Sequence, residues 1–210
     1  MNKAIIGKKL GMTQIFTPDG LVVPVTVVEA GPCTVVQKKT VAKEGYNSVV
    51  VAFDETKESR VNKAQMGAFK KANVTAHRIL RELRLDDVSA YEIGKPILCD
   101  IFNEKDKVDV VGLTRGRGFT GVIQRWNAHR LRMTHGVSLV HRSVGSMGAN
   151  SSPSRVFKNK RLPGQYGHEQ VTIQNLEIVK VDAARGVLLI KGAIPGPKGG
   201  VVCISDSVKA

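Results

Sequence analysis

The sequence predicts a mainly β protein, a closed antiparallel β-barrel with a small helical insert and a long, basic, glycine-rich extension. Short β-branched runs, separated by Gly and Pro, occur near both ends of the chain. This pattern stops over residues 54–87, and residues 112–168 have a composition found nowhere else in the chain. We therefore divide the sequence into a barrel body (1–111 and 169–210), with its insert at about 54–90, and an extension at 112–168.

The strands expected before the extension are rich in Val, Ile and Thr and are bounded by turn residues. They lie at residues 21–28, 33–37, 48–53, 96–102 and 107–111. Pro24 interrupts the first run, so we expect it at a sheet edge or a bulge. The strands expected after the extension lie at 170–181, 186–191 and 201–204. A single barrel assembled from both ends of the chain is the economical arrangement.

The insert is predicted to contain a helix that begins near Asn73 or Thr75. Its apolar residues fall at i, i+3, i+4 and i+7, which places them on one helix face: Ala76, Ile79, Leu80 and Leu83. Several basic residues lie in the same region, namely Lys63, Lys70, Lys71, Arg78, Arg81 and Arg84. They either contact nucleic acid or form a solvated face, and the sequence does not decide between the two.

Composition places the chain among cytosolic globular proteins. It has 210 residues, 42% of them apolar, and no apolar run approaches the roughly 18 residues that span a bilayer. The N-terminus lacks the apolar core of a signal peptide. The chain has three cysteines, Cys33, Cys99 and Cys203, and no Cys-x-x-Cys pair. We therefore expect all three to be reduced residues of the core.

The extension predicts a nucleic-acid partner through its charge. Residues 112–168 contain ten of the 32 Lys and Arg residues, nine Gly, four of the five His and no Asp or Glu. The other 22 Lys and Arg residues are nearly balanced by the 18 Asp and Glu residues, which all lie outside this segment. Most of the net charge of +14 therefore belongs to residues 112–168. Such a segment has too few aliphatic side chains to form its own core, and we expect RNA or DNA to order it.

Three other sites are suggested by residues of the extension. Residues 116–121 match the dinucleotide fingerprint Gly-x-Gly-x-x-Gly, but no acid follows until Glu169 and no βαβ unit precedes them. His129, His135 and His141 are spaced six apart, which suits neither a helical metal pair nor a zinc finger. A Cys–His nucleophile has no local signature. Stacking on bases or bonding to phosphate suits these histidines better.

Aromatic residues of the extension have two possible roles. Trp126, Phe157 and Tyr166 either stack on unpaired bases or pin the root of the extension.

Ten sequence motifs resemble the bacterial form of universal large-subunit ribosomal protein three, and they cover essentially the whole chain in order. They are residues 7–16 (GKKLGMTQIF), 24–29 (PVTVVE), 115–119 (RGRGF), 134–136 (THG), 141–142 (HR), 145–148 (GSMG), 155–158 (RVFK), 163–167 (PGQYG), 174–176 (QNL) and 191–197 (KGAIPGP).

The resemblance implies a structural, non-enzymatic constituent of the cytoplasmic ribosome. It implies a barrel on the outside of the large subunit and an extension that threads through the large-subunit (23S) rRNA toward the peptidyl transferase centre, with its tip at about residues 148–152. It further implies a role in early assembly and neighbouring large-subunit proteins as partners, with no cofactor, metal, membrane or small-molecule substrate. Asn150 matches the tip asparagine of the family. Ser151 stands where many members carry a methylated glutamine, so that modification is not carried over.

Sixteen residues are expected to contact rRNA. They are Arg115, Arg117, Arg125, Trp126, His129, Arg130, Arg132, His135, His141, Arg142, Asn150, Ser151, Arg155, Lys158, Lys160 and Arg161. Two other functions are kept open beside this one. The first is a nucleic-acid-modifying enzyme built around His135 and His141, which would need a carboxylate or ligand cluster that the segment lacks. The second is a free-standing DNA- or RNA-binding regulator.

Overall fold

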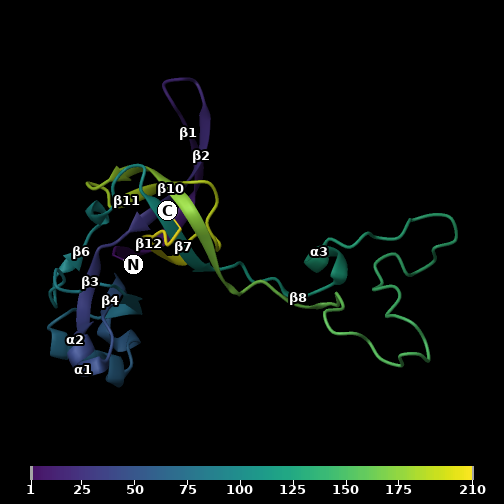
Figure 1. The fold of residues 1–210 in the computed structure, drawn as a ribbon, viewed down its shortest axis with the longest axis horizontal. Helices are drawn as coiled ribbons and strands as arrows, with labels where there is room; N and C mark the ends of the chain where they lie inside the picture. The colour runs from purple at the N-terminus through teal and green to yellow at the C-terminus, as the bar shows by residue number, and fades with distance from the viewer. Residues whose placement is uncertain (1, 210) are drawn as a thin grey trace. The chain divides into compact units, whose positions relative to one another are not determined.

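The computed structural model describes residues 2–209, which separate into two compact units. The first unit takes in the chain up to Thr114 and again from Gln170 onward, and the second spans Arg115–Glu169. The first unit combines a closed barrel with a smaller sheet (Figure 1). Within residues 2–209, no helix has both the length and the apolar character needed to cross a membrane.

Six antiparallel strands close the barrel in the order β1-β12-β7-β10-β11-β2. The predicted mainly β class and closed antiparallel barrel are therefore confirmed. Strand β1 pairs with β12 on one side and with β2 on the other, so both ends of the chain are needed for closure. The strands are β1 (Ala4–Phe16), β2 (Val22–Ala30), β7 (Lys107–Leu113), β10 (Gln170–Asp182), β11 (Val187–Lys191) and β12 (Val201–Asp206).

A second sheet of four strands, in the order β5-β4-β3-β6, completes the first unit together with short helices. Its strands are β3 (Cys33–Lys39), β4 (Ser48–Glu55), β5 (His77–Arg84) and β6 (Pro96–Ile97). The helices are α1 (Val41–Glu44), α2 (Lys63–Ala72) and the 3₁₀ turns η1 (Glu58–Arg60) and η2 (Cys99–Ile101).

Most predicted strands are present, with ends shifted by one or two residues. Pro24 lies where β2 extends beyond its β11 partner, since the β11 pairing ends at Val25, and this agrees with the expected edge position. The sequence pattern does not predict β1, because Gly7, Lys8 and Lys9 interrupt its apolar run.

The helix predicted to begin near Asn73 or Thr75 is wrong, because this stretch leads into strand β5. Ile79 and Leu83 pack into the main core, whereas Leu80 contacts a second cluster around Phe69 of α2. Both faces of β5 are thus covered, and apolar side chains on both faces imitate the spacing of a helix. The helix of this region is α2, and Asn73 ends it in the left-handed conformation with φ 53°.

The strand predicted over residues 96–102 is wrong beyond Ile97. The chain turns into η2, and a 3₁₀ turn brings side chains at i and i+3 to the same side. Cys99 and Phe102 are both buried by this turn, whereas a strand would direct them to opposite faces.

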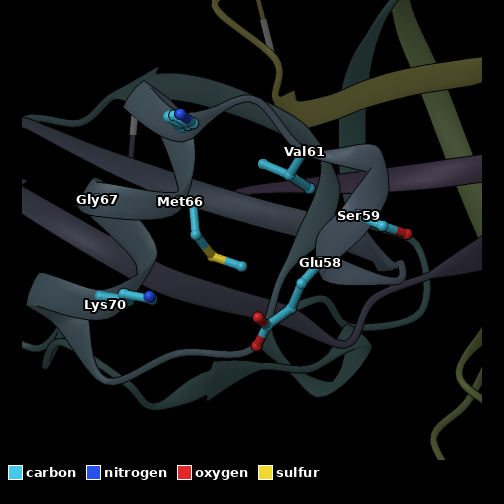
Figure 2. A pocket seen from close by; sticks show the side chains of 7 residues that line it. Glu58, Ser59, Val61, Met66, Gly67 and Lys70 are labelled. Carbon is cyan, nitrogen blue, oxygen red and sulfur yellow. The ribbon is translucent and has the colours of Figure 1, made fainter.

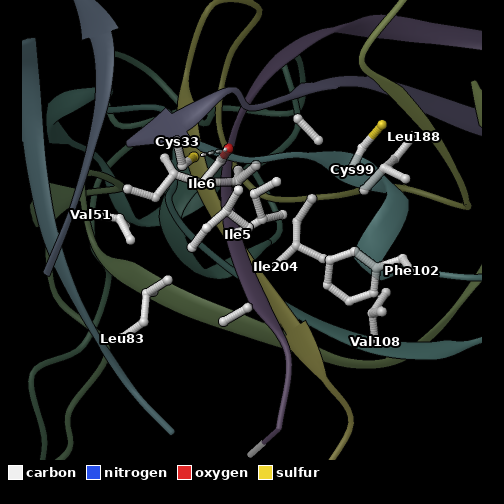
Figure 3. Close-up of a cluster of buried hydrophobic side chains, with 14 of the residues drawn as sticks. Ile5, Ile6, Cys33, Val51, Leu83, Cys99, Phe102, Val108, Leu188 and Ile204 are labelled. Atoms are coloured by element: carbon white, nitrogen blue, oxygen red, sulfur yellow. Dashed lines mark hydrogen bonds between the residues drawn. The ribbon is translucent and has the colours of Figure 1, made fainter. Parts of the chain in front are cut away.

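One core connects the barrel with the smaller sheet (Figure 3). Ile5, Ile204 and Leu188 come from barrel strands, and Val51 and Leu83 come from the second sheet. The two sheets of the first unit therefore share one hydrophobic cluster and are expected to unfold together.

The cysteines are free thiols, as predicted. Cys33 and Cys99 are buried, and Cys203 is partly buried against the core. The Cys33 thiol donates a hydrogen bond to the carbonyl of Ile6 (3.3 Å), and burial raises the pKa of Cys33 to about 12. This thiol is therefore unreactive at neutral pH.

A buried carboxylate holds an irregularity in the barrel. Strand β10 shifts its register against β7 between Ile173 and Leu176, and Asn175 adopts φ 57° there. The backbone N–H of Asn175 donates to Oδ1 of Asp109 (2.8 Å), and the N–H of Val208 reaches Oδ2 (3.5 Å). Asp109 thus satisfies a backbone donor that the bulge removes from the ladder.

We expect Asp109→Ala to lower the free energy of unfolding by about 2 kcal/mol, because it leaves the N–H of Asn175 without its charged acceptor. Denaturant unfolding measures this loss, and hydrogen exchange at Asn175 should become faster. Asp109→Asn keeps an acceptor oxygen and should lose less. Unchanged protection of the Asn175 amide in Asp109→Ala would contradict this role.

A polar network ties three strands of the smaller sheet. Ser48 donates to Oε1 of Glu82 (2.7 Å), and Lys39 Nζ donates to Oε2 (3.0 Å) and to the Tyr46 hydroxyl (2.9 Å). Hydrogen bonds from Ser48, Tyr46 and Lys39 lower the pKa of Glu82 to about 2. The ionised carboxylate is therefore favoured in the folded state.

This lowered pKa predicts a pH-dependent contribution to stability. The contribution of Glu82 is fully present above pH 4.5 and is lost as the pH falls toward 2, because the folded pKa lies below the unfolded one. We expect this contribution to be about 1 kcal/mol, since the Glu82 side chain is 34% exposed and water screens its charge. Unfolding of wild type and Glu82→Gln should differ at pH 6 and converge near pH 2, and a constant difference would contradict this assignment.

Candidate nucleic-acid interface

The root of the second unit is a two-stranded ladder. Strand β8 (Gly118–Thr120) pairs antiparallel with β9 (Gly164–Tyr166), and the N–H of Arg117 extends the ladder by donating to Tyr166 O (2.8 Å). A Cβ on Gly167 would lie 2.0 Å from the carbonyl oxygen of Arg115, so only glycine fits at that position. The outgoing arm of the segment, which contains β8, and the returning arm, which contains β9, are thereby joined at their base.

A cluster around Trp126, at the end of the short helix α3 (Val122–Trp126), joins the same two arms. The indole N–H of Trp126 and Nη1 of Arg125 both donate to the carbonyl of Leu162, at 3.0 and 2.9 Å. The guanidinium groups of Arg125 and Arg161 lie 5.0 and 5.9 Å from the Trp126 ring. A Cβ on Gly164 would lie 2.6 Å from Nη1 of Arg125, so glycine leaves room for this contact. We call Arg125, Trp126, Arg161 and Leu162 the root clamp.

Between helix α3 and strand β9, residues 127–163 contain no helix or strand (Figure 1). Local contacts shape the loop instead. The N–H of Leu131 donates to His141 O (3.0 Å), and His141 Nδ1 lies 2.7 Å from Arg132 O. Ser146 exchanges hydrogen bonds with Gly148, and the Ser154 hydroxyl donates to Ser151 O. These contacts link near neighbours and enclose no core.

Fourteen of the sixteen predicted contact residues are exposed, and Arg125 and His141 are half-buried. The structure brings Arg125, Trp126 and Arg161 together and leaves the others spread along the loop. Arg117 lies 5.5 Å from the Tyr166 ring and Arg155 lies 5.3 Å from the Phe157 ring. Large apolar side chains are also uncovered, with Leu139 96% and Phe119 81% exposed.

The electrostatics of this unit follow from its sequence. Residues 115–169 contain ten Arg or Lys and one acid, Glu169, at the final position. Exposed cations at this density repel one another unless an external anion neutralises them. The exposed apolar and aromatic groups give such an anion surfaces to stack on.

The metal and dinucleotide alternatives each require a specific arrangement of residues. Among residues 2–209, no three His, Cys, Asp or Glu side chains are grouped so that they could hold a metal ion. In the Gly-x-Gly-x-x-Gly stretch, Gly118 already belongs to β8, which pairs antiparallel with β9, and Gly121 precedes a helix of five residues. A dinucleotide site needs a parallel βαβ unit, so this interpretation is wrong.

Sequence reasoning missed the structural partners of the root clamp. The Leu162 carbonyl accepts two side-chain hydrogen bonds, and a backbone acceptor leaves no signal in a sequence. Gly164 and Gly167 stand among nine glycines of similar appearance, and only the close approaches of Arg125 and Arg115 distinguish them.

A comparison with protein families agrees with the motifs. The family model described as ribosomal protein L3 matches residues 84–186. The matched stretch includes β7, the whole second unit and β10, so it spans the candidate interface and the two barrel strands from which the interface leaves. This match supports the assignment of the chain to the ribosomal protein L3 family.

Proposed function

We propose that this chain is a structural, non-enzymatic constituent of the large ribosomal subunit and binds large-subunit rRNA through residues 115–169. The observation that carries the proposal is a unit with ten largely exposed cations and one acid, within a stretch that matches a ribosomal protein family. Phosphate neutralisation is the main energetic term. The chain acts in the cytoplasm beside other large-subunit proteins, without a cofactor or a membrane.

The root clamp supports a division of labour within the unit. Arg125 and Trp126 are occupied by Leu162, so they hold the two arms of the loop together and limit the conformations that rRNA must order. Trp126 remains 40% exposed, which leaves part of its ring for a base. The exposed cations, such as Arg130, Arg132 and Arg142, then neutralise phosphates.

The tip of the loop supports a second role. Residues 143–154 carry no charge and consist mainly of Gly, Ser and other small residues. Cations flank this stretch at Arg142 and Arg155, and Asn150 and Ser151 are exposed within it. Small side chains with amide and hydroxyl groups suit a crowded RNA surface. We propose that the flanks anchor the loop during early assembly and that Asn150 approaches the peptidyl transferase centre.

Sedimentation tests the subunit assignment. The protein should remain with large subunits after a high-salt wash that strips loosely bound factors. A free-standing regulator would be released, and recovery of the protein only in the unbound fraction would overturn the proposal.

We expect Arg130→Ala, Arg132→Ala and Arg142→Ala together to flatten the slope of log K against log salt by roughly 2 to 3, because each lost phosphate contact removes roughly 0.7 to 0.9. Binding of the full chain to transcribed large-subunit rRNA at several salt concentrations measures this slope. The control substitutes Lys95, Lys107 and Arg185, which pair with carboxylates, and so removes the same charge. Equal slopes for the two triple variants would reject phosphate neutralisation by the loop.

We expect Asn150→Asp to change susceptibility to drugs that bind the peptidyl transferase centre while large subunits still form, because it adds a negative charge among phosphates. Asn150→Ser serves as the uncharged control. Arg142→Ala with Arg155→Ala should instead impair incorporation. Subunit profiles and drug susceptibility are compared in strains that carry each change. Unaltered susceptibility, or an assembly defect as severe as that of the arginine pair, would contradict the separation of tip and flanks.

A further inference from the structure

A second cluster of cations lies around helix α2, in the first unit. Residues 57–71 contain one acid, Glu58, and five exposed cations, namely Lys57, Arg60, Lys63, Lys70 and Lys71. This stretch precedes residue 84, where the family match begins. The cluster therefore belongs neither to the candidate interface nor to the matched residues.

One face of α2 forms the wall of an open groove of about 520 Å³ (Figure 2). Lys63, Met66, Gly67 and Lys70 line it at i, i+3, i+4 and i+7, so they share this helix face. The other lining residues come from η1 and the residue after it, and they are Glu58, Ser59 and Val61.

The ammonium groups of Lys63 and Lys70 have no ion-pair or hydrogen-bond partner among residues 2–209. Among residues 2–209, the ion pairs of this region join Arg78 to Asp54 and Lys39 to Glu82, and none includes Lys63 or Lys70. Both ammonium groups remain available to an external anion. Seven residues separate them, which corresponds to about 10 Å along the helix axis.

Gly67 lies between the two lysines and has no structural reason to be glycine. It sits in the interior of α2, where alanine is the more favourable residue, and it does not adopt a positive φ. A Cβ added at this position would meet no atom within 4 Å. The missing side chain leaves the helix backbone open in the middle of the groove, where a ligand can approach it closely.

We propose that this groove binds the phosphodiester backbone of RNA, with Lys63 and Lys70 on two phosphates and the strand passing over Gly67. Lysine suits this contact as a flexible point charge, and the hydroxyl of Ser59 can bond to a phosphate or a 2′-hydroxyl. Glu58 opposes the anion from the other wall and marks the edge of the site. The inference goes beyond the proposed function because it adds a contact surface in the other unit.

Salt-dependent binding of the full chain to transcribed large-subunit rRNA tests the groove. Lys63→Ala with Lys70→Ala should flatten the slope of log K against log salt by roughly 1.4 to 1.8, which corresponds to two phosphate contacts. The control pair, Lys95→Ala with Arg185→Ala, removes equal charge from lysine and arginine side chains that already have carboxylate partners. If the two pairs give the same slope, the groove does not bind RNA.

Two single variants test the groove without removing a cation. Gly67→Ala should raise the melting temperature of the protein and yet weaken RNA binding, because the methyl group occupies the approach to the backbone. Glu58→Gln should tighten binding more than Glu104→Gln, an exposed glutamate outside the groove. Unchanged affinity in Gly67→Ala, or equal effects of the two glutamine variants, would overturn the inference. The proposed function is judged separately by the variant of Arg130, Arg132 and Arg142.

Discussion

The pairing of β7 with β10 is the constraint on which the rest of the structure depends. Leu113 lies opposite Gln170, so the chain leaves the barrel and returns to it through neighbouring strands, although more than 50 residues separate them in sequence. On its other side β7 pairs with β12, which pairs with β1, so this exit belongs to a closed barrel. The barrel already holds the two ends of this long loop together. Ordering of the loop by a ligand therefore no longer includes the entropy cost of joining those ends. A rigid frame presents a segment that has no core of its own.

Charge explains why that segment is not folded more completely. Ten cations and one acid cannot neutralise one another, and its large apolar side chains remain exposed. Regular structure in the segment is limited to the β8–β9 ladder and helix α3, and the root clamp joins the two arms next to them. In the clamp, two guanidinium groups lie against one indole ring, so cations are held by an aromatic face and a carbonyl in place of carboxylates. This arrangement leaves the excess positive charge available to an external anion while it shapes the base of the loop.

The RNA contact proposed for the α2 groove would use the same chemistry on a folded support. Its lysines stand on a helix that is itself packed on the smaller sheet through Phe69, so their spacing is set by helix geometry. The loop cations, in contrast, stand on a segment that, under the proposed function, RNA would order. Together the two surfaces would combine a preformed contact with one that is ordered on binding, and the preformed contact loses less entropy when it forms.

The sequence by itself determined the class of fold and predicted a polyanionic partner. β-branched runs such as Val25–Val28 and Val49–Val51 specify strands because their side chains pack on a pleated surface, and the absence of acids from residues 112–168 indicates a polyanion. The motifs then identified the family. Local pattern was sufficient for these conclusions because each depends on neighbouring residues.

Only the tertiary structure decided which faces are covered and which distant groups meet. His77–Arg84 is a strand because α2 covers one of its faces and the main core covers the other. The sequence of this segment alone does not reveal that both faces are covered. Strand β1 forms despite its glycines and lysines because β12 and β2 flank it, and Lys9 finds the carbonyls of Ile194 and Gly196. The root clamp and the α2 groove depend on contacts across turns and on backbone carbonyls. Such contacts arise from closure of the chain in three dimensions, which a one-dimensional pattern does not encode.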